Sequence, residues 1–402
     1  MMRHVSIVLI AAGAVAACND RADVQCEENA NCNLTSGGIC ATAGTGNRWC
    51  AYADPNCPSG YRYSDQDVGD GVSSACVSTT DAGVPSDGAT DGPASQLSAS
   101  CVALPNTCGV SSNDSCCNSL PVPGGTFFRS YDAAPDSHSG DKNSPATISS
   151  FRLDKYEITV GRFRAFLADG QGTQAKHPAT GSGTHVNIAG SGWQGSWNTS
   201  LTFNTTSLLT ALKCDSPFQT WTDAAGANEN RPINCITWYE AMAFCIWDGG
   251  YLPTAAEWNY AATGGDAQRA YPWSSPDAGS LTLSGSYASY SDGPTSDAPN
   301  CLGDGMPGCA LTDLIAVGTR PMGDGRWGQS DLAGNVDEWT LDYDADYAVP
   351  CTDCANLTVS SGRVMFGGDF KNPAIFLRTG FRTYNAPANR FSQFGARCAR
   401  AP

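Results

Sequence analysis

The sequence has little charge and little histidine. Only 15% of its 402 residues are Asp, Glu, Lys or Arg, against roughly 25% in an average soluble protein. The 23 Lys and Arg face 39 Asp and Glu, which gives a formal net charge of −16. A chain this acidic repels phosphate backbones, so we expect no nucleic-acid partner. The 4 histidines show no HxxxH grouping, so a metal site built from a histidine cluster is not indicated.

Long apolar runs are absent except at the start of the chain, so we expect no membrane-spanning helix. Residues 5–17 are apolar, follow a short basic start and end in small residues, as in a secretory signal. The sequence Val15-Ala16-Ala17-Cys18 is similar to a bacterial lipobox, in which Cys18 is acylated after residues 1–17 are removed. Simple cleavage, with Cys18 in a disulfide, is the alternative. The lipobox interpretation predicts a lipid anchor in the cell envelope, facing the periplasm or the exterior.

Cysteine is plentiful, which indicates an oxidising compartment. Without Cys18, the 19 cysteines leave an even number for disulfides. Residues 18–76 contain few aliphatic side chains, so we predict a small module held by disulfides of undetermined pairing. A zinc site is the competing interpretation, but this stretch has neither a CxxC pair nor a histidine. Its cysteines are Cys26, Cys32, Cys40, Cys50, Cys57 and Cys76.

The rest of the chain divides into a linker and one large domain. Residues 77–100 are rich in Ser, Thr, Asp, Gly and Pro, which predicts a flexible linker. Residues 101–402, with a core of about 120–400, carry most of the aromatic side chains. The 44 Gly and 23 Pro favour short strands and turns over long helices.

Three helices are predicted within the large domain. Thr237 and Glu240 form a capping-box pattern, and Thr254 and Glu257 repeat it. A further helix is expected at about 159–167, where apolar side chains recur at helical spacing.

Several short segments, in this order, resemble the formylglycine-generating enzyme (sulfatase-modifying factor) family. The resemblance implies an α+β fold similar to C-type lectins, with low regular secondary structure, preceded here by the small disulfide-rich module. The low regular content agrees with the abundance of Gly and Pro. The segments are 122–127 (VPGGTF), 151–159 (FRLDKYEIT), 231–238 (RPINCITW), 252–261 (LPTAAEWNYA), 271–273 (YPW), 331–339 (DLAGNVDEW), 363–368 (RVMFGG) and 394–398 (FGARC).

The resemblance also implies what this chain lacks. Formylglycine-generating enzymes use oxygen and a copper ion held by two cysteines, three and eight residues after the serine of a GGS motif. Here Asp369 replaces that serine, and the two cysteine positions fall on Asn372 and Leu377. An amide and an alkyl side chain supply no soft thiolate for Cu(I). We therefore expect no copper and no formylglycine production, and Asp369, Asn372 and Leu377 mark the family's pocket without being confirmed as catalytic.

Structural calcium is the cofactor that the resemblance supports better. The matching ligands are the side chains of Asp331 and Glu338 and the carbonyls of Gly334 and Val336. Alternatively, the two acidic side chains only hydrogen-bond to turn amides.

A second family calcium site matches Asn300 and Asp313, with the carbonyls of Cys301 and Ile315. The alternative there is a solvated acidic loop.

The resemblance also pairs Cys245 with Cys398. Local disulfides are plausible at Cys214–Cys235, Cys301–Cys309 and Cys351–Cys354. The last has CxxC spacing, and a redox-active role is its alternative to a structural one.

Three functions remain open. The favoured hypothesis is an extracytoplasmic lipoprotein whose large domain binds an unknown ligand or protein partner on the enzyme scaffold, at residues 369–391. The basic side chains there either bind an anionic ligand or pair with internal carboxylates; they are Lys371, Arg378, Arg382 and Arg390. The alternative is an oxidoreductase of the same family that uses another metal or substrate, with Asp369, Asn372 and Tyr384 as candidates by position. The third is a structural envelope protein.

Overall fold

A computed structural model of the chain describes most of the large domain and parts of the segment before it. The described residues are 26, 32, 39–42, 48–53, 61–64, 75–77, 98–102, 104–132, 134, 141–274, 281–293, 295 and 299–402. The chain divides into two compact units, residues 1–95 and 96–402. Cys18, the signal at 1–17 and most of the linker at 77–100 lie outside the described residues.

The described part of the first unit contains a three-stranded antiparallel sheet. Its strands are β1 (Ile39–Thr42), β2 (Arg48–Ala53) and β3 (Tyr61–Tyr63). Disulfides Cys26–Cys40 and Cys32–Cys50 tie this sheet to the chain before it. The sulfur atoms of Cys26, Cys32 and Cys50 lie within 4.8 Å of one another, but all three belong to disulfides and so are not thiolate ligands for zinc.

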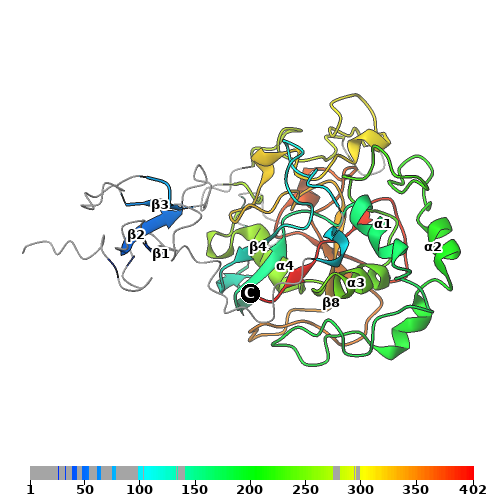
Figure 1. The fold of residues 1–402 in the computed structure, drawn as a ribbon, viewed down its shortest axis with the longest axis horizontal. Helices are drawn as coiled ribbons and strands as arrows, with labels where there is room; N and C mark the ends of the chain where they lie inside the picture. Colours follow the sequence, from blue (N-terminus) through cyan, green and yellow to red (C-terminus); the bar gives the residue numbers. More distant parts are fainter. Residues whose placement is uncertain are drawn as a thin grey trace, which may run out of the picture. The chain divides into compact units, whose positions relative to one another are not determined.

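The second unit combines short helices with small sheets (Figure 1). The strands pair in the orders β10-β9-β8-β11, β12-β7-β4 and β5-β6. The strands are β4 (Ser119–Val122), β5 (Gly125–Phe128), β6 (Pro145–Ile148), β7 (Phe151–Asp154), β8 (Asp337–Tyr343), β9 (Arg363–Phe366), β10 (Arg382–Asn385), β11 (Phe394–Gly395) and β12 (Ala399–Arg400). The helices are α1 (Val160–Ala168), α2 (Thr205–Ala211), α3 (Trp238–Trp247) and α4 (Ala255–Thr263). Among the described helices, none is both long and apolar enough to cross a membrane.

The helix starts follow the capping patterns in the sequence. The Thr237 hydroxyl accepts a hydrogen bond from Glu240 N, and the Glu240 carboxylate accepts one from Thr237 N, so both halves of the capping box are formed. Thr254 and Glu257 make the same reciprocal pair at α4. Thr159 caps α1. All three helix predictions are confirmed.

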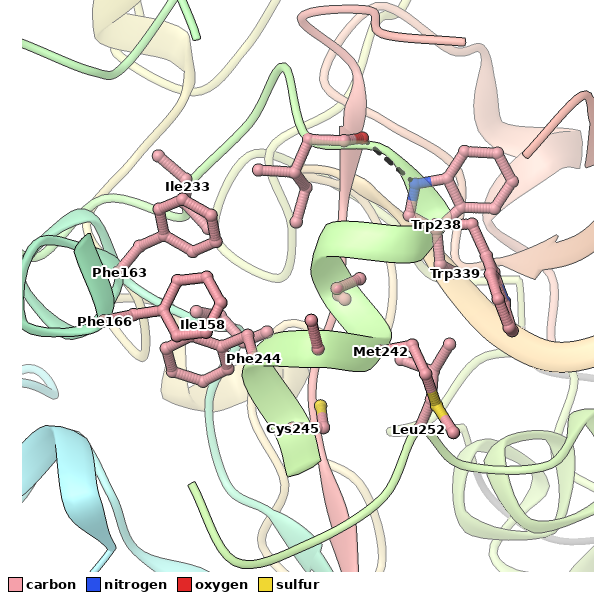
Figure 2. Packing of buried hydrophobic residues seen from close by; sticks show 14 of the residues in the cluster. Ile158, Phe163, Phe166, Ile233, Trp238, Met242, Phe244, Cys245, Leu252 and Trp339 are labelled. Carbon is pink, nitrogen blue, oxygen red and sulfur yellow. Dashed lines mark hydrogen bonds between the residues drawn. The ribbon is translucent and has the colours of Figure 1, made fainter. Parts of the chain in front are cut away.

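The larger hydrophobic core lies where α1 packs against α3 (Figure 2). The rings of Phe163 and Phe166 lie 5.8 and 5.5 Å from the ring of Phe244 in α3. The disulfide Cys245–Cys398 fastens the end of α3 to the residue before β12, as the resemblance implied. These contacts join segments that are far apart in the sequence. The candidate site lies at the β10-β9-β8-β11 sheet.

Candidate functional site

A cavity of about 170 Å³ lies at one end of the β10-β9-β8-β11 sheet. Strand pairing brings its walls together: Asp337 at the start of β8 lies opposite Phe394 in β11, and Met365 in β9 lies opposite Thr383 in β10. The turn after β9 and the 3-10 helix η8 (Ala374–Leu377) complete the walls. The lining residues are Asp337, Met365, Phe366, Gly367, Gly368, Asn372, Phe376, Phe381, Thr383, Asn385 and Phe394.

The turn after β9 depends on two glycines. Gly367 and Gly368 have φ angles of +100° and +66°, in the region that favours glycine. A Cβ on Gly368 would lie 3.0 Å from the Leu377 side chain and from the Phe376 carbonyl, so a larger residue would be crowded here as well as strained. The turn directs Gly368 N toward β8, where it donates to Asp337 Oδ1 at 3.0 Å.

Asp337 places a buried carboxylate at the cavity. Its side chain is only 7% exposed. Oδ1 accepts the hydrogen bond from Gly368 N, and Oδ2 accepts none from the described residues. Asp369 is buried nearby, and its Oδ1 accepts a hydrogen bond from Lys371 N at 2.7 Å. Burial, followed by the charge of Asp369, raises the pKa of Asp337 well above its ordinary value. Burial also raises the pKa of Asp369 to about 7.

Sequence reasoning missed Asp337. The available signal was the pair Asp337–Glu338 at the start of a strand that is buried along its whole length. Because successive strand residues face opposite sides of a sheet, one acid of the pair points to each side. Glu338 turns toward Arg397, whereas Asp337 turns toward the cavity.

The other walls of the cavity are largely aromatic. The rings of Phe376 and Phe381 meet edge to face at 4.6 Å, and Phe394 lies on β11 beside Asp337. Phe376 and Phe381 are half-buried, so this side of the cavity reaches solvent, whereas Asp337 is buried. None of the lining residues is a cysteine or a histidine. A carboxylate among apolar rings is suited to hold a cation or to exchange a proton.

Residues 107–402 match the family model of the sulfatase-modifying factor enzyme 1-like domain. The chain belongs to this family. The match, together with the mixed helices and sheets, confirms both the resemblance and the α+β fold class expected from the sequence.

Relatives in the sulfatase-modifying factor family carry different names. The formylglycine-generating enzyme of Thermomonospora curvata is 29% identical over 310 residues, which cover 70% of this chain and 93% of that protein. The hercynine oxygenase of Mycolicibacterium smegmatis is 27% identical over 302 residues, which cover 70% of this chain and 60% of that protein. Among solved structures, PvdO from Pseudomonas aeruginosa has a TM-score of 0.46 and 20% identity, over 71% of this chain and 94% of that one. Family membership therefore does not by itself assign a reaction.

The positions that the resemblance assigns to copper ligands lie beside the cavity. Asn372 lines it, and its Oδ1 accepts a hydrogen bond from Asp369 N at 3.3 Å. Leu377 is 1% exposed and packs with Tyr271 and Tyr290 in a separate apolar cluster. Within the described residues from 98 onward, every cysteine belongs to a disulfide. The pairs are Cys101–Cys117, Cys108–Cys116, Cys214–Cys235, Cys245–Cys398, Cys301–Cys309 and Cys351–Cys354.

The first expected calcium position lies on the other side of β8. Glu338 is fully buried, and its carboxylate accepts hydrogen bonds from the Arg397 guanidinium and from Trp258 Nε1, each at 2.7 Å. Asp331 has a φ of +57°, and its Oδ2 accepts a hydrogen bond from Gly318 N at 2.6 Å. Both expected acidic ligands therefore already have protein partners.

A third carboxylate, Glu157, gives this region an excess of negative charge. Glu157 is fully buried, and one oxygen accepts a hydrogen bond from Asn335 Nδ2 at 3.0 Å while Oε1 has no partner. Burial, then the charges of Asp331 and Glu338, raise the pKa of Glu157 well above its ordinary value. Burial likewise raises the pKa of Asp331 to about 6. Three carboxylates beside the single Arg397 guanidinium fit a divalent cation in charge.

At the second expected calcium position, the side-chain oxygens accept hydrogen bonds from turn amides. Asn300 Oδ1 accepts from Gly308 N at 2.9 Å, and the two oxygens of Asp313 accept from Asp304 N and Ala310 N. No hydrogen bond joins Asn300 to Asp313 within the described chain.

The carbonyls expected to complete that second site come from Cys301, which forms the Cys301–Cys309 disulfide, and from Ile315. The Ile315 carbonyl accepts a hydrogen bond from Asn335 Nδ2 at 3.4 Å. The side-chain oxygens expected as ligands here accept hydrogen bonds from the backbone, and calcium binding at this position stays a prediction.

The arginines of the 369–391 region pair internally. Arg378 lies 2.9 Å from Asp132 in a buried ion pair, and Arg390 binds the Glu240 carboxylate. Arg382 lies 3.9 Å from Asp344. The remaining cation of the set is Lys371, whose Nζ lies 3.4 Å from the ring centroid of Phe218. Of the two alternatives, internal pairing is the one that the structure shows for the arginines.

Proposed function

We propose that this protein is a lipid-anchored, extracytoplasmic member of the sulfatase-modifying factor family whose large domain binds a ligand or partner and does not make formylglycine. The binding site is the cavity at the end of the β10-β9-β8-β11 sheet, where the family's chemistry would take place. The proposal includes no nucleic-acid partner, because the chain has a formal net charge of −16.

One observation carries the proposal. The cavity is lined by a carboxylate, amides and aromatic rings, and no thiolate is available at it. Cu(I) requires soft ligands, and the positions for them hold Asn372 and Leu377. The cysteines of the domain are committed to disulfides, so another cysteine pair does not replace them among the described residues.

The proposed extracytoplasmic location is supported by the lipobox-like segment and by the disulfides. Cys18 ends a lipobox-like segment, and the many disulfides of the described chain are typical of an oxidising compartment. Mass spectrometry of the mature N-terminus tests this part: a diacylated or triacylated Cys18 supports the anchor, and an unmodified N-terminus contradicts it.

We also propose one structural calcium ion near β8. The acidic excess of Glu157, Asp331 and Glu338, with the unpartnered Glu157 Oε1, supports it. The oxygens of Glu157, Asp331 and Glu338 do not all lie within 4.8 Å of one another. The proposed ligands are therefore those that the resemblance implies: the side chains of Asp331 and Glu338 and the carbonyls of Gly334 and Val336. A calcium ion there would neutralise buried charge and hold the start of β8 in place.

An oxidation assay tests the main proposal. The purified full chain is loaded with Cu(I) under reducing conditions, then mixed with a cysteine-containing sulfatase peptide in oxygenated buffer. An active formylglycine-generating enzyme serves as positive control, and aldehyde formation and oxygen uptake are measured. We expect neither from this protein. Aldehyde formation would overturn the proposal, and oxygen uptake with another metal or substrate would favour the alternative oxidoreductase.

A further inference from the structure

The cavity is lined by a carboxyl group, Asp337, for which the described residues supply no counter-ion. The Asp337 side chain is 7% exposed. Among the described residues, Oδ1 accepts a hydrogen bond from Gly368 N, whereas Oδ2 accepts none and stays accessible to water. Burying most of a carboxylate without a counter-ion costs free energy. Such a group is retained more readily where a bound cation supplies the missing partner.

Neither Arg397 nor Lys371 forms an ion pair with Asp337 in the described structure. Arg397 binds both oxygens of Glu338 on the opposite side of β8. Lys371 lies over the ring of Phe218, and no ion pair within 4.0 Å joins it to Asp337 or Asp369 in the described structure. Asp337 therefore lacks an internal counter-ion.

The rings around Asp337 decide which kind of cation fits. Four phenylalanine rings line the cavity, and Trp258 stacks on the ring of Phe366. The four are Phe366, Phe376, Phe381 and Phe394. Aromatic faces attract ammonium groups and tolerate their hydrocarbon substituents. A divalent metal ion instead needs about six oxygen ligands, usually with several carboxylates, and Asp337 is the one carboxylate among the residues that line this cavity.

The size of the cavity limits the ligand. A cavity of about 150 Å³ accommodates a benzene molecule, so the 170 Å³ measured here holds an ammonium group with a short aliphatic stem. The half-buried Thr383 and Asn385 lie on the solvent side and supply polar groups for the entrance.

We propose that this cavity binds an alkylammonium group, with Asp337 Oδ2 accepting its N–H hydrogen bonds and the phenylalanine rings enclosing its stem. This inference rests on the proposed binding function and specifies the ligand class. The group can belong to a free amine or to a lysine side chain of a partner protein, because both present the same chemistry.

The test measures binding of n-butylammonium to the full chain by isothermal titration calorimetry. Neutral 1-butanol, which has a similar stem and no charge, is the ligand control. The D337N variant keeps the size of the side chain and removes its charge. We expect D337N to weaken n-butylammonium binding by at least about tenfold, the size of one hydrogen bond between charged partners. D346N, at an exposed position that does not line this cavity, is the matched control and should bind as the unaltered protein does.

A second variant tests the contribution of the aromatic rings separately from that of the carboxylate. F381L retains an apolar wall and removes one aromatic face, so it should weaken n-butylammonium binding about threefold, in line with one cation–π contact, and leave 1-butanol unchanged. A capped lysine peptide distinguishes the source: tighter binding than the free amine identifies a protein lysine, and weaker binding identifies a free amine.

The inference is overturned if n-butylammonium does not bind, if 1-butanol binds equally well, or if D337N binds as tightly as the unaltered protein. Tighter, Asp337-dependent binding of Ca²⁺, Mg²⁺ or Mn²⁺ would also overturn it, because the site would then hold an inorganic cation. None of these results produces aldehyde from a sulfatase peptide, so failure here leaves the proposed function to its own assay.

Discussion

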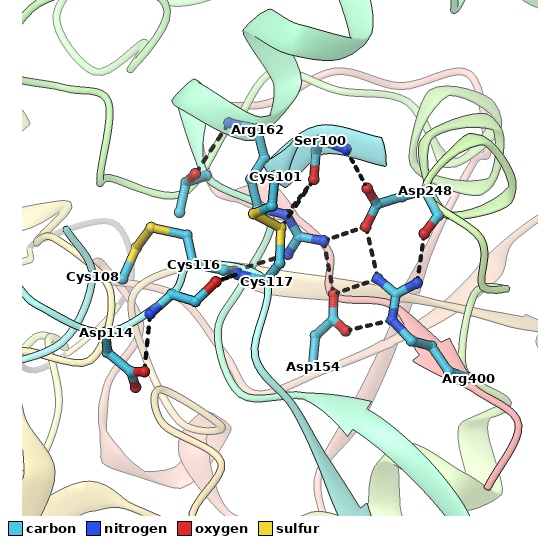
Figure 3. Close-up of a disulfide and its surroundings, with 12 residues drawn as sticks. Ser100, Cys101, Cys108, Asp114, Cys116, Cys117, Asp154, Arg162, Asp248 and Arg400 are labelled. Carbon is cyan, nitrogen blue, oxygen red and sulfur yellow. Dashed lines mark hydrogen bonds and ion pairs between the residues drawn. A yellow bond between two sulfur atoms is a disulfide. The ribbon is translucent and has the colours of Figure 1, made fainter. Parts of the chain in front are cut away.

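Arg162 and Asp248 form an ion pair of 2.6 Å in which neither side chain is exposed to solvent (Figure 3). The same guanidinium lies 3.0 Å from Asp154, and both carboxylates also bind Arg400. Ser100 joins the group from the disulfide-bonded segment: its backbone N donates to Asp248 Oδ1 at 2.8 Å. This network connects α1, the end of α3, β7 and β12.

The first prediction concerns this network. R162M removes the fully buried guanidinium and leaves two buried carboxylates with the partly exposed Arg400, so we expect the free energy of unfolding to fall by about 3 kcal/mol. Urea unfolding followed by tryptophan fluorescence measures it. R164M is the matched control: Arg164 pairs with Glu229, both side chains are partly exposed, and its loss should cost about 1 kcal/mol or less. Equal losses in the two variants would contradict the assignment.

The second prediction compares two disulfides. Cys245 and Cys398 are 153 residues apart in sequence, whereas Cys351 and Cys354 are 3 apart. In the chain-entropy model, replacing both cysteines by alanine costs about 5 kcal/mol for the long loop and about 2 kcal/mol for the short one. Melting temperatures of the two double-alanine variants should therefore differ clearly, with C245A/C398A lower. The reverse order would show that native-state packing outweighs loop closure.

The third prediction concerns pH. His185 is buried, and its Nε2 lies 3.1 Å from Glu257 Oε1. Burial lowers the pKa of His185, but the hydrogen bond and charge of Glu257 outweigh it and raise the pKa above its ordinary value of 6.5. The ion pair therefore contributes fully to stability below that value, and the contribution is lost as the pH rises through the raised pKa.

H185Q isolates this contribution. The stability difference between the unaltered protein and H185Q should be largest in mild acid and shrink as the pH rises past neutrality. Unfolding free energies across the pH range measure it. H177Q, which removes an exposed imidazole, should leave the pH profile as in the unaltered protein. A pH-independent difference for H185Q would refute the prediction.

The fourth prediction concerns calcium. Chelation should lower the melting temperature, because a ligand present at about 100 times its Kd stabilises the folded state by about 2.7 kcal/mol. D331N should abolish this response and still fold, because asparagine tolerates the φ of +57° at this position. Glu338 is unsuitable for the test, since its removal would leave Arg397 buried without its main partner. A melting temperature unaffected by chelation in the unaltered protein would count against the ion.

The sequence by itself determined the local and the inherited features of this protein. The capping boxes at Thr237 and Thr254 formed as predicted because their partners lie three residues away, where a helix turn brings them together. The family motifs, in order along the chain, predicted the family and its α+β fold, and they led to the prediction that Asn372 and Leu377 stand where relatives hold copper.

Only the tertiary structure decided the contacts between distant segments. Arg378 pairs with Asp132, which lies 246 residues away in the sequence. This ion pair neutralises an arginine that the sequence alone left available for an anionic ligand. Asp337 lines the cavity because the fold places the turn at Gly368 and the rings of Phe376 and Phe394 beside it. The sequence specifies which side chains are ionisable. Their counter-ions and their exposure to water depend on which strands and turns pack beside them.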